Sequence, residues 1–194
     1  MVMWRYVDDA RGEGLLNMAT DRALLNACNE GVTPPTLRLY GWLKPTLSVG
    51  YSQRSWDEIN IHHCQEKKVP IVRRPTGGRI ILHHEELTYS IVAPLDYPGF
   101  PKGLRKTHQA ISEVLVDCLN RLELPNPARV CSGISSKEPG ELKAKACFAL
   151  SNAFEVTVDG KKIIGSAQRR LKKAFLQHGS ILLRFDPEMT NQCL

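Results

Sequence analysis

The sequence lacks a long apolar run, an internal repeat and a low-complexity tract. No stretch approaches the roughly 20 apolar residues that a membrane-spanning helix requires. The opening residues, MVMWRYVDDARGEG, are polar and do not contain the apolar centre of a secretory signal. We therefore expect a cytoplasmic protein that is not inserted in a membrane.

Paired cysteine motifs are also missing. The six cysteines, at positions 28, 64, 118, 131, 147 and 193, form no CxxC unit, so we expect reduced thiols rather than disulfides. The segments 62–64 (HHC) and 83–86 (HHEE) do not have the ligand spacing of a zinc site. Neighbouring residues on a strand also point to opposite faces. These absences predict that the protein holds no metal.

Aromatic residues make up 7% of the chain and are not interleaved with the basic residues. This pattern argues against a surface that stacks single-stranded nucleic acid. The chain does carry an excess of positive charge, +6 from 26 basic and 20 acidic residues, which favours an acidic partner. Charge alone does not choose between nucleic acid and an acidic carrier protein.

The remaining composition is that of an ordinary globular domain: 194 residues, 42% hydrophobic and 24% charged. Periodicity and turn residues predict helices at 15–30, 56–67 and 106–122, and strands at 36–43, 47–51, 69–74, 79–84, 87–93, 154–158, 161–168 and 175–185. Strands 69–74 and 79–84 are expected to form a hairpin across Gly77-Gly78. The pattern predicts an α+β fold, with helices packed on a mixed, largely antiparallel sheet.

The segment VRRPTGGR at 72–79 combines positive charge with backbone freedom. Gly77 and Gly78 allow a ligand to approach the backbone, and Arg73, Arg74 and Arg79 could bind a phosphate or a carboxylate. The spacing matches neither GxxxxGK[ST] nor GxGxxG. From spacing alone, a plain hairpin with solvated arginines explains the segment equally well.

Cys147 and Lys162 are the two side chains whose positions suggest covalent chemistry. Cys147 follows Lys143 and Lys145, and nearby cations stabilise a thiolate. Strand alternation places Lys162 and Lys161 on opposite faces, so that one of them points inward, where an ammonium group needs a partner. The alternatives are a buried structural cysteine and a pair of solvated lysines at the end of a hairpin.

Three ordered motifs resemble one family. RRPTGGRIILHHEELTYS resembles the RRxTGGRxxxHxxELTYS signature of the lipoate–protein ligase A/B and octanoyltransferase family. GKKIIGSAQRR, followed by FLQHGSILL, resembles the second signature of this family. WRYVDDARGEGLLNMATDRALL and PTLRLYGWLKPTLSVGYSQ resemble its opening. The resemblance covers essentially the whole chain.

The resemblance implies a fold like the class II synthetase or biotin–lipoate ligase catalytic domain. Residues 1–194 would form a single such domain that lacks the C-terminal extension. In the family, the first signature binds the acyl group, the lysine contacts the acyl carbonyl region, and the glycine-rich strand forms the wall behind it. The implied substrate-binding residues are Arg73, Arg74, Thr76, Gly77, Gly78, Arg79, His83, Gly165, Ser166, Ala167, His178 and Gly179, and the implied catalytic residues are Cys147 and Lys162.

Cys147 stands eight residues before Glu155 and fifteen before Lys162, and it resembles the catalytic cysteine of Gram-positive-type octanoyltransferases. The implied reaction moves an octanoyl group from acyl carrier protein, through a thioester on Cys147, to a lysine of a lipoyl domain or of glycine-cleavage H protein. It requires no cofactor. Ser151-Asn152 stand where these transferases have Pro-Ser, and an asparagine here is more typical of the ligases.

Three alternatives remain from the sequence. The first is an ATP-dependent lipoate–protein ligase, which would need magnesium and could need a partner chain; a biotin ligase fits less well because its loop reads GRGRxG. The second is a non-catalytic protein that binds acyl carriers or lipoyl domains. The third is a nucleic-acid-binding protein, whose retention on heparin would be sensitive to salt.

Overall fold

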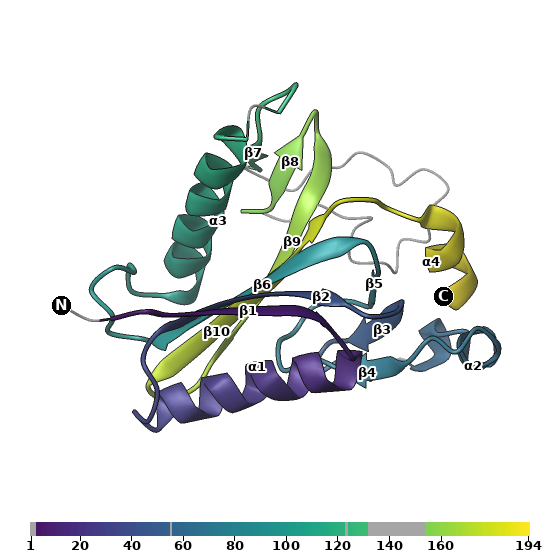
Figure 1. Cartoon of the computed structure of the whole chain (residues 1–194), viewed down its shortest axis with the longest axis horizontal. Coiled ribbons are helices and arrows are strands. Elements are labelled where there is room, and N and C mark those ends of the chain that lie inside the picture. The colour runs from purple at the N-terminus through teal and green to yellow at the C-terminus, as the bar shows by residue number, and fades with distance from the viewer. Residues whose placement is uncertain (1–2, 55, 123, 132–153) are drawn as a thin grey trace.

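The protein is described here by a computed structural model, which describes residues 3–54, 56–122, 124–131 and 154–194. The strands are β1 (Arg5–Gly12), β2 (Thr36–Trp42), β3 (Thr46–Val49), β4 (Ile71–Arg73), β5 (Ile81–His83), β6 (Glu86–Pro94), β7 (Arg129–Val130), β8 (Val156–Val158), β9 (Lys161–Arg170) and β10 (Ala174–Leu182). The helices are α1 (Gly14–Asn29), α2 (Ile61–Glu66), α3 (Leu104–Asn120) and α4 (Pro187–Cys193), with a 3₁₀ turn at Trp56–Glu58. Figure 1 shows their arrangement.

The large sheet has the strand order β1-β2-β6-β10-β9-β8-β7. Its central strands β6, β10 and β9 run antiparallel, and β1 alone pairs in parallel, with β2. The predicted α+β fold with a mixed, largely antiparallel sheet is therefore confirmed.

The two long helices cover opposite faces of this sheet (Figure 1). On α1, the buried residues Met18, Asp21, Leu25 and Cys28 follow a 3-4-3 spacing that forms one stripe. Leu25 and Cys28 of this stripe pack against Val92 of β6 and against β10. Helix α3 packs its own stripe against the other face. The face beneath α1 is the one that carries the candidate site.

Apolar residues of α3 recur at helical spacing, at Ile111, Val114, Leu115, Cys118 and Leu119, but the buried stripe is narrower than this set. Ile111 is buried and Leu115 and Leu119 pack in the core, whereas Val114 is 62% exposed and Cys118 is also exposed. Helix α3 packs mainly against β7, β8 and β9, and the side of its apolar stripe with Val114 and Cys118 remains exposed.

A second sheet of three strands has the order β4-β3-β5. The predicted hairpin of 69–74 with 79–84 is wrong, because β3 lies between the two strands, parallel to β4 and antiparallel to β5. The segment between them is therefore a loop that crosses over β3. The Gly-Gly pair suggested a tight turn, but the side-chain bonds described below hold a wider one.

The predicted helix 56–67 is also divided. The 3₁₀ turn ends at Glu58, and α2 begins at Ile61 after Asn60, whose side chain accepts a hydrogen bond from the backbone N–H of His63. Asn60 thus supplies the N-terminal cap. The strand β1 and the helix α4 were not predicted. None of the helices in the described part of the chain is long and apolar enough to cross a membrane.

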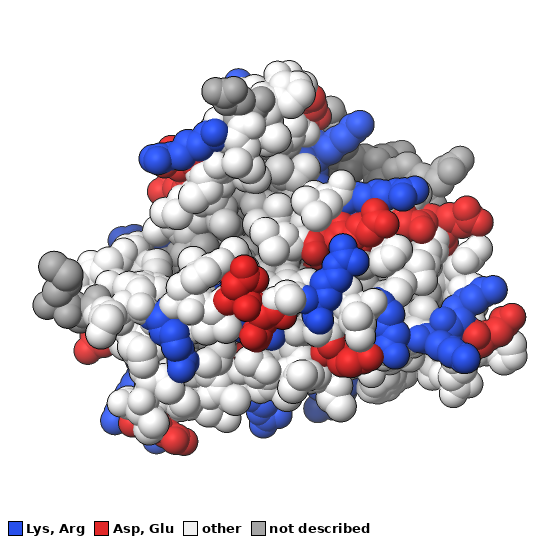
Figure 2. All heavy atoms as spheres, in the orientation of Figure 1, with Lys and Arg blue, Asp and Glu red and all other residues white. Residues whose placement is uncertain are grey.

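Acidic and basic side chains are interspersed on the face in Figure 2. The net charge of +6 is therefore not gathered into a single basic patch on this face. An extended contact with nucleic acid would favour such a patch.

Candidate active site

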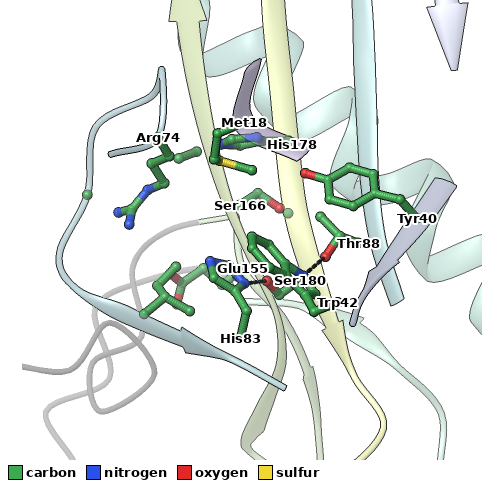
Figure 3. A pocket seen from close by; sticks show the side chains of 15 residues that line it. Met18, Tyr40, Trp42, Arg74, His83, Thr88, Glu155, Ser166, His178 and Ser180 are labelled. Atoms are coloured by element: carbon green, nitrogen blue, oxygen red, sulfur yellow. Dashed lines mark hydrogen bonds between the residues drawn. The ribbon is translucent and has the colours of Figure 1, made fainter. Parts of the chain in front are cut away.

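A cavity of about 90 Å³ opens on the α1 face of the large sheet. Its walls come from α1, β2, β6, β9, β10 and the crossing loop after β4. The lining residues are Met18, Tyr40, Trp42, Arg74, Gly78, Ile81, His83, Thr88, Glu155, Gly165, Ser166, Ala167, His178, Gly179 and Ser180 (Figure 3). Eight of the predicted substrate-binding residues lie in this wall: Arg74, Gly78, His83, Gly165, Ser166, Ala167, His178 and Gly179.

Arg74 shapes the crossing loop from inside. Its side chain is buried and donates hydrogen bonds to the carbonyl of Ser48 at 3.0 Å, of Gly77 at 2.9 Å and of Arg79 at 2.6 Å. These side-chain hydrogen bonds hold the loop together in place of the backbone hydrogen bonds that a hairpin would have formed. Arg74, which the sequence suggested as a ligand for a phosphate or a carboxylate, therefore holds the shape of the loop in this structure.

The glycines of this region permit close backbone contacts. Gly78 has φ +96°, and a Cβ there would lie 2.7 Å from the Arg74 guanidinium. A Cβ on Gly50 would lie 2.1 Å from the carbonyl oxygen of Gly78. For Gly77 a Cβ would meet nothing within 4 Å. The predicted need for backbone freedom therefore applies to Gly78 but not to Gly77.

Other predicted loop residues do not line the cavity. Arg73 is exposed and donates to the carbonyls of Gly50 at 2.6 Å and Gln53 at 2.9 Å, which fixes the turn after β3. Thr76 is buried, and its hydroxyl lies 2.7 Å from Nε2 of His178. Arg79 is exposed. These residues support the wall rather than forming it.

One end of the cavity is built around Asp21, a fully buried residue of α1. Its carboxylate accepts from Nη1 of Arg38 at 2.9 Å, from the Tyr40 hydroxyl at 3.0 Å and from Nδ1 of His178 at 2.8 Å. Burial alone would raise the pKa of Asp21, but the hydrogen bond and charge of His178, together with the Arg38 guanidinium, hold it below its ordinary value. Both ring nitrogens of His178 and the hydroxyl of Tyr40 are used in this cluster.

A second buried cluster lies around Glu86 on β6. One oxygen, Oε1, accepts from the Trp42 indole at 2.9 Å, from Nδ1 of His83 at 2.8 Å and from the Thr88 and Ser180 hydroxyls at 2.7 Å each. Burial would raise the pKa of Glu86, and the charge and hydrogen bonds of these donors lower it. The His83 ring is stacked on Trp42 at 4.0 Å between centroids, so this contact and the bond to Glu86 hold His83 in the cavity wall.

Lys162 and Glu155 form a buried ion pair beside the cavity. Their Nζ and Oε1 atoms are 2.5 Å apart, and the two side chains are 3% and 4% exposed. Of the two predicted alternatives, Lys162 points inward and Lys161 is exposed. Glu155 contributes directly to the cavity wall.

A register shift aims Lys162 at this side of the sheet. Ile164 pairs with Val156, but Lys162 pairs with Thr157, so that Ile163 is an extra residue. In a regular strand Lys162 and Ile164 would share a face, and Ile164 packs in the cluster beneath α3. The irregularity therefore turns the lysine toward the cavity.

The wall behind the cavity is a close contact between β9 and β10. Gly179 pairs with Ser166, and a Cβ on Gly179 would lie 2.7 Å from the carbonyl of Gly165 and from a ring carbon of Tyr89. The Ser166 hydroxyl lies 2.7 Å from the Tyr89 hydroxyl, and burial raises the pKa of Tyr89 to about 12. The predicted wall residues are brought together here.

Sequence reasoning missed several residues of the site: Met18, Asp21, Arg38, Tyr40, Trp42, Ile81, Glu86, Thr88, Glu155 and Ser180. One signal was available, because alternation along TLRLYGW places Arg38 in register with Tyr40 and Trp42, and a charged residue in a buried register implies a buried partner. The predicted catalytic Cys147 lies outside the described residues.

Chemically, the cavity has two different regions. Apart from Oε2 of Glu86, which has no partner among the described residues, the polar atoms around Asp21 and Glu86 bind one another, which leaves carbon-rich surfaces suited to an apolar chain. The Lys162–Glu155 pair supplies the polar group at which a carbonyl could lie. The arrangement therefore suits a molecule with an apolar tail and a reactive polar head.

The fold is that of lipoate–protein ligases. A lipoate-protein ligase A bound with ATP matches with a TM-score of 0.75 and 23% identity, over 100% of this chain and 71% of that one. A bi-partite lipoate protein ligase from Thermoplasma acidophilum matches with a TM-score of 0.72 and 22% identity, over 100% of this chain and 67% of that one. At these identities the match concerns the fold.

Residues 13–194 match the model of the lipoyl protein ligase A/B catalytic domain, and the chain belongs to this family. The octanoyltransferase LipM of Kyrpidia tusciae is 43% identical over 188 residues, which cover 97% of this chain and 69% of the relative. The octanoyltransferase LipM of Halalkalibacterium halodurans is 40% identical over 191 residues, 97% of this chain and 68% of the relative. The family resemblance inferred from the motifs is therefore confirmed.

Proposed function

We propose that this protein is an octanoyltransferase. It takes an octanoyl group from acyl carrier protein and delivers it to a lysine of a lipoyl domain or of glycine-cleavage H protein. The observation that carries the proposal is the identity of 43% with an octanoyltransferase over 97% of the chain, together with a cavity that has an apolar wall and, beside it, a buried lysine paired with the lining residue Glu155. The proposed enzyme works in the cytoplasm as a single catalytic domain and uses no cofactor.

The proposed reaction proceeds in two acyl transfers. The thiolate of Cys147 attacks the thioester carbonyl, the bond to the carrier sulfur breaks, and the carrier leaves as a thiol after taking a proton. The acceptor lysine, as a free amine, then attacks the new thioester; the amide forms, the amine loses a proton, and the Cys147 thiolate is regenerated. The ammonium of Lys162 is assigned to the acyl carbonyl, where it stabilises the charge that develops on oxygen.

The test is the intact mass of the pure protein after mixing with octanoyl–acyl carrier protein in the absence of ATP. We expect a mass increase of one octanoyl group that hydroxylamine removes and that Cys147→Ala abolishes. Cys118→Ala, which changes an exposed cysteine of α3, serves as the matched control and should keep the adduct. A folded wild-type protein that forms no adduct with loaded carrier would refute the thioester route.

The second candidate is an ATP-dependent lipoate–protein ligase, and the fold match to ligases favours it. The same acceptor is then incubated with lipoate, ATP and magnesium. A ligase should modify the acceptor under these conditions and keep most of its activity in Cys147→Ala, whereas a transferase should lose it. Lys162→Ala should inactivate both, so full activity of that variant would contradict the site assignment.

A further inference from the structure

A second hollow lies directly behind the acyl cavity. It has a volume of about 450 Å³ and runs between α1, the turn after β3 and the end of β9. Leu15, Arg22, Tyr51, Arg169 and Leu171 are among its lining residues. We call it the arginine groove. Met18 and Arg74 line both the cavity and the groove, and they therefore form the partition between them.

The groove lies at the end of the cavity that is remote from Lys162. Along β9, Gly165 and Ala167 line the cavity, and the next residue on that face, Arg169, lines the groove. His178, which pairs with Ala167, lies beside Met18 at one end of the cavity in Figure 3, while Glu155 lies toward the other. An acyl chain with its carbonyl at Lys162 would therefore extend toward Met18.

The two partition residues differ in how they are held. Arg74 is fixed by its hydrogen bonds to the carbonyls of Ser48, Gly77 and Arg79. Met18 is an unbranched apolar side chain, 4% exposed, that packs in a cluster with Tyr40, Trp42 and Val72. Of the two, Met18 is the side chain whose size can change without dismantling the crossing loop.

We propose that Met18 is the end wall of the acyl cavity and limits the length of the chain that the enzyme transfers. The direction of the chain rests on the proposed function. Shortening Met18 to Ala removes three heavy atoms and joins the cavity to the arginine groove. The terminal methyl group of a longer chain would then pass into a hollow whose lining includes Leu15, Leu25 and Leu171.

The experiment is a competition among hexanoyl, octanoyl, decanoyl and dodecanoyl groups on acyl carrier protein, scored by the mass of the modified acceptor. Each buried methylene contributes about a fourfold preference. Met18→Ala should therefore raise the decanoyl-to-octanoyl ratio by about 16-fold over wild type. Met18→Phe, which lengthens the wall, should shift the preference from octanoyl to hexanoyl.

Leu16→Ala is the matched control, because Leu16 is on the same helix, is 63% exposed and lines neither space; its profile should equal that of wild type. Met18→Val provides a second shortening if Met18→Ala does not fold by circular dichroism, and it should give a smaller shift in the same direction. A folded Met18 variant with the wild-type profile would overturn the proposal.

Binding measurements separate this proposal from the proposed function. Calorimetric titration with octanoic and dodecanoic acids requires no transfer. Met18→Ala should bind dodecanoic acid more tightly relative to octanoic acid than wild type does, even if wild type transfers no octanoyl group. Equal relative affinities in the two proteins would refute the role of Met18, whereas a missing transfer activity would refute only the octanoyltransferase.

Discussion

The Lys162–Glu155 ion pair leads to a quantitative prediction about stability. Both side chains are at least 96% buried, with Nζ and Oε1 2.5 Å apart. Removing one member of a buried pair takes an opposite charge away from the other, at a cost of about 3–5 kcal/mol. For a domain of this size, 1 kcal/mol changes Tm by about 2–4 °C. Glu155→Gln should therefore lower Tm by about 6–20 °C.

Removing both charges should restore most of the loss. Glu155→Gln combined with Lys162→Met leaves no buried ammonium at this position, so the free energy of unfolding of the double variant should be close to or above that of wild type. The double-mutant cycle should give a coupling free energy of about 2–3 kcal/mol. The double variant should nevertheless be inactive, because it lacks the Lys162 ammonium that we assign to the acyl carbonyl.

Urea unfolding followed by circular dichroism gives the free energy of unfolding of the four proteins of the cycle: wild type, Glu155→Gln, Lys162→Met and the double variant. The control is Asp117→Asn, which breaks the Asp117–Arg121 pair on α3, whose side chains are 70% and 78% exposed; its effect should be about 0.5 kcal/mol or less. If the two single effects simply add to within about 0.5 kcal/mol, the pair is not coupled, and the reasoning from burial is wrong.

Three further variants test other parts of the site. Asp21→Asn should destabilise by about 3–5 kcal/mol at pH 7; because the pKa of Asp21 is lowered in the fold, its contribution is present above its unfolded value and is lost as pH falls through the folded one, so urea unfolding at pH 3 should show a smaller difference. Gly50→Ala should reduce transfer by about 100-fold, because its Cβ would lie 2.1 Å from the carbonyl of Gly78; wild-type kcat/KM would contradict this. Tyr89→Phe leaves Ser166 without its buried partner and should cost about 1–3 kcal/mol in urea unfolding; an unchanged midpoint would show that this bond contributes nothing.

The parts of the fold that follow local periodicity were predictable. Helix α1 and the strands β2, β6, β9 and β10 fall within a few residues of the predicted ranges, because each has one buried face whose spacing is visible in the sequence. Alternation also indicated that one of Lys161 and Lys162 points inward, but which of the two does so depends on the register shift against β8.

Features that depend on distant residues were not predictable. The position of β3 between β4 and β5 results from non-local pairing, which a Gly-Gly signal does not report. The buried role of Arg74 depends on carbonyls of Ser48, Gly77 and Arg79, and an arginine beside glycines looks the same in either environment. A buried structural arginine and a solvated arginine differ in their tertiary partners, and the local sequence does not show these partners.

The extra residue in β9 has a consequence for how this active site can evolve. Inserting one residue between Val156 and Thr157 would leave every proposed functional side chain in place in the sequence, including Lys162. Ile163 would then have a partner on β8, and the regular strand that resulted would turn Lys162 to the face that packs against α3. A homologue with the complete motif but one residue more in β8 would therefore contain the lysine without presenting it to the cavity. In this protein, the pairing of β8 with β9 decides on which face of the sheet the lysine lies.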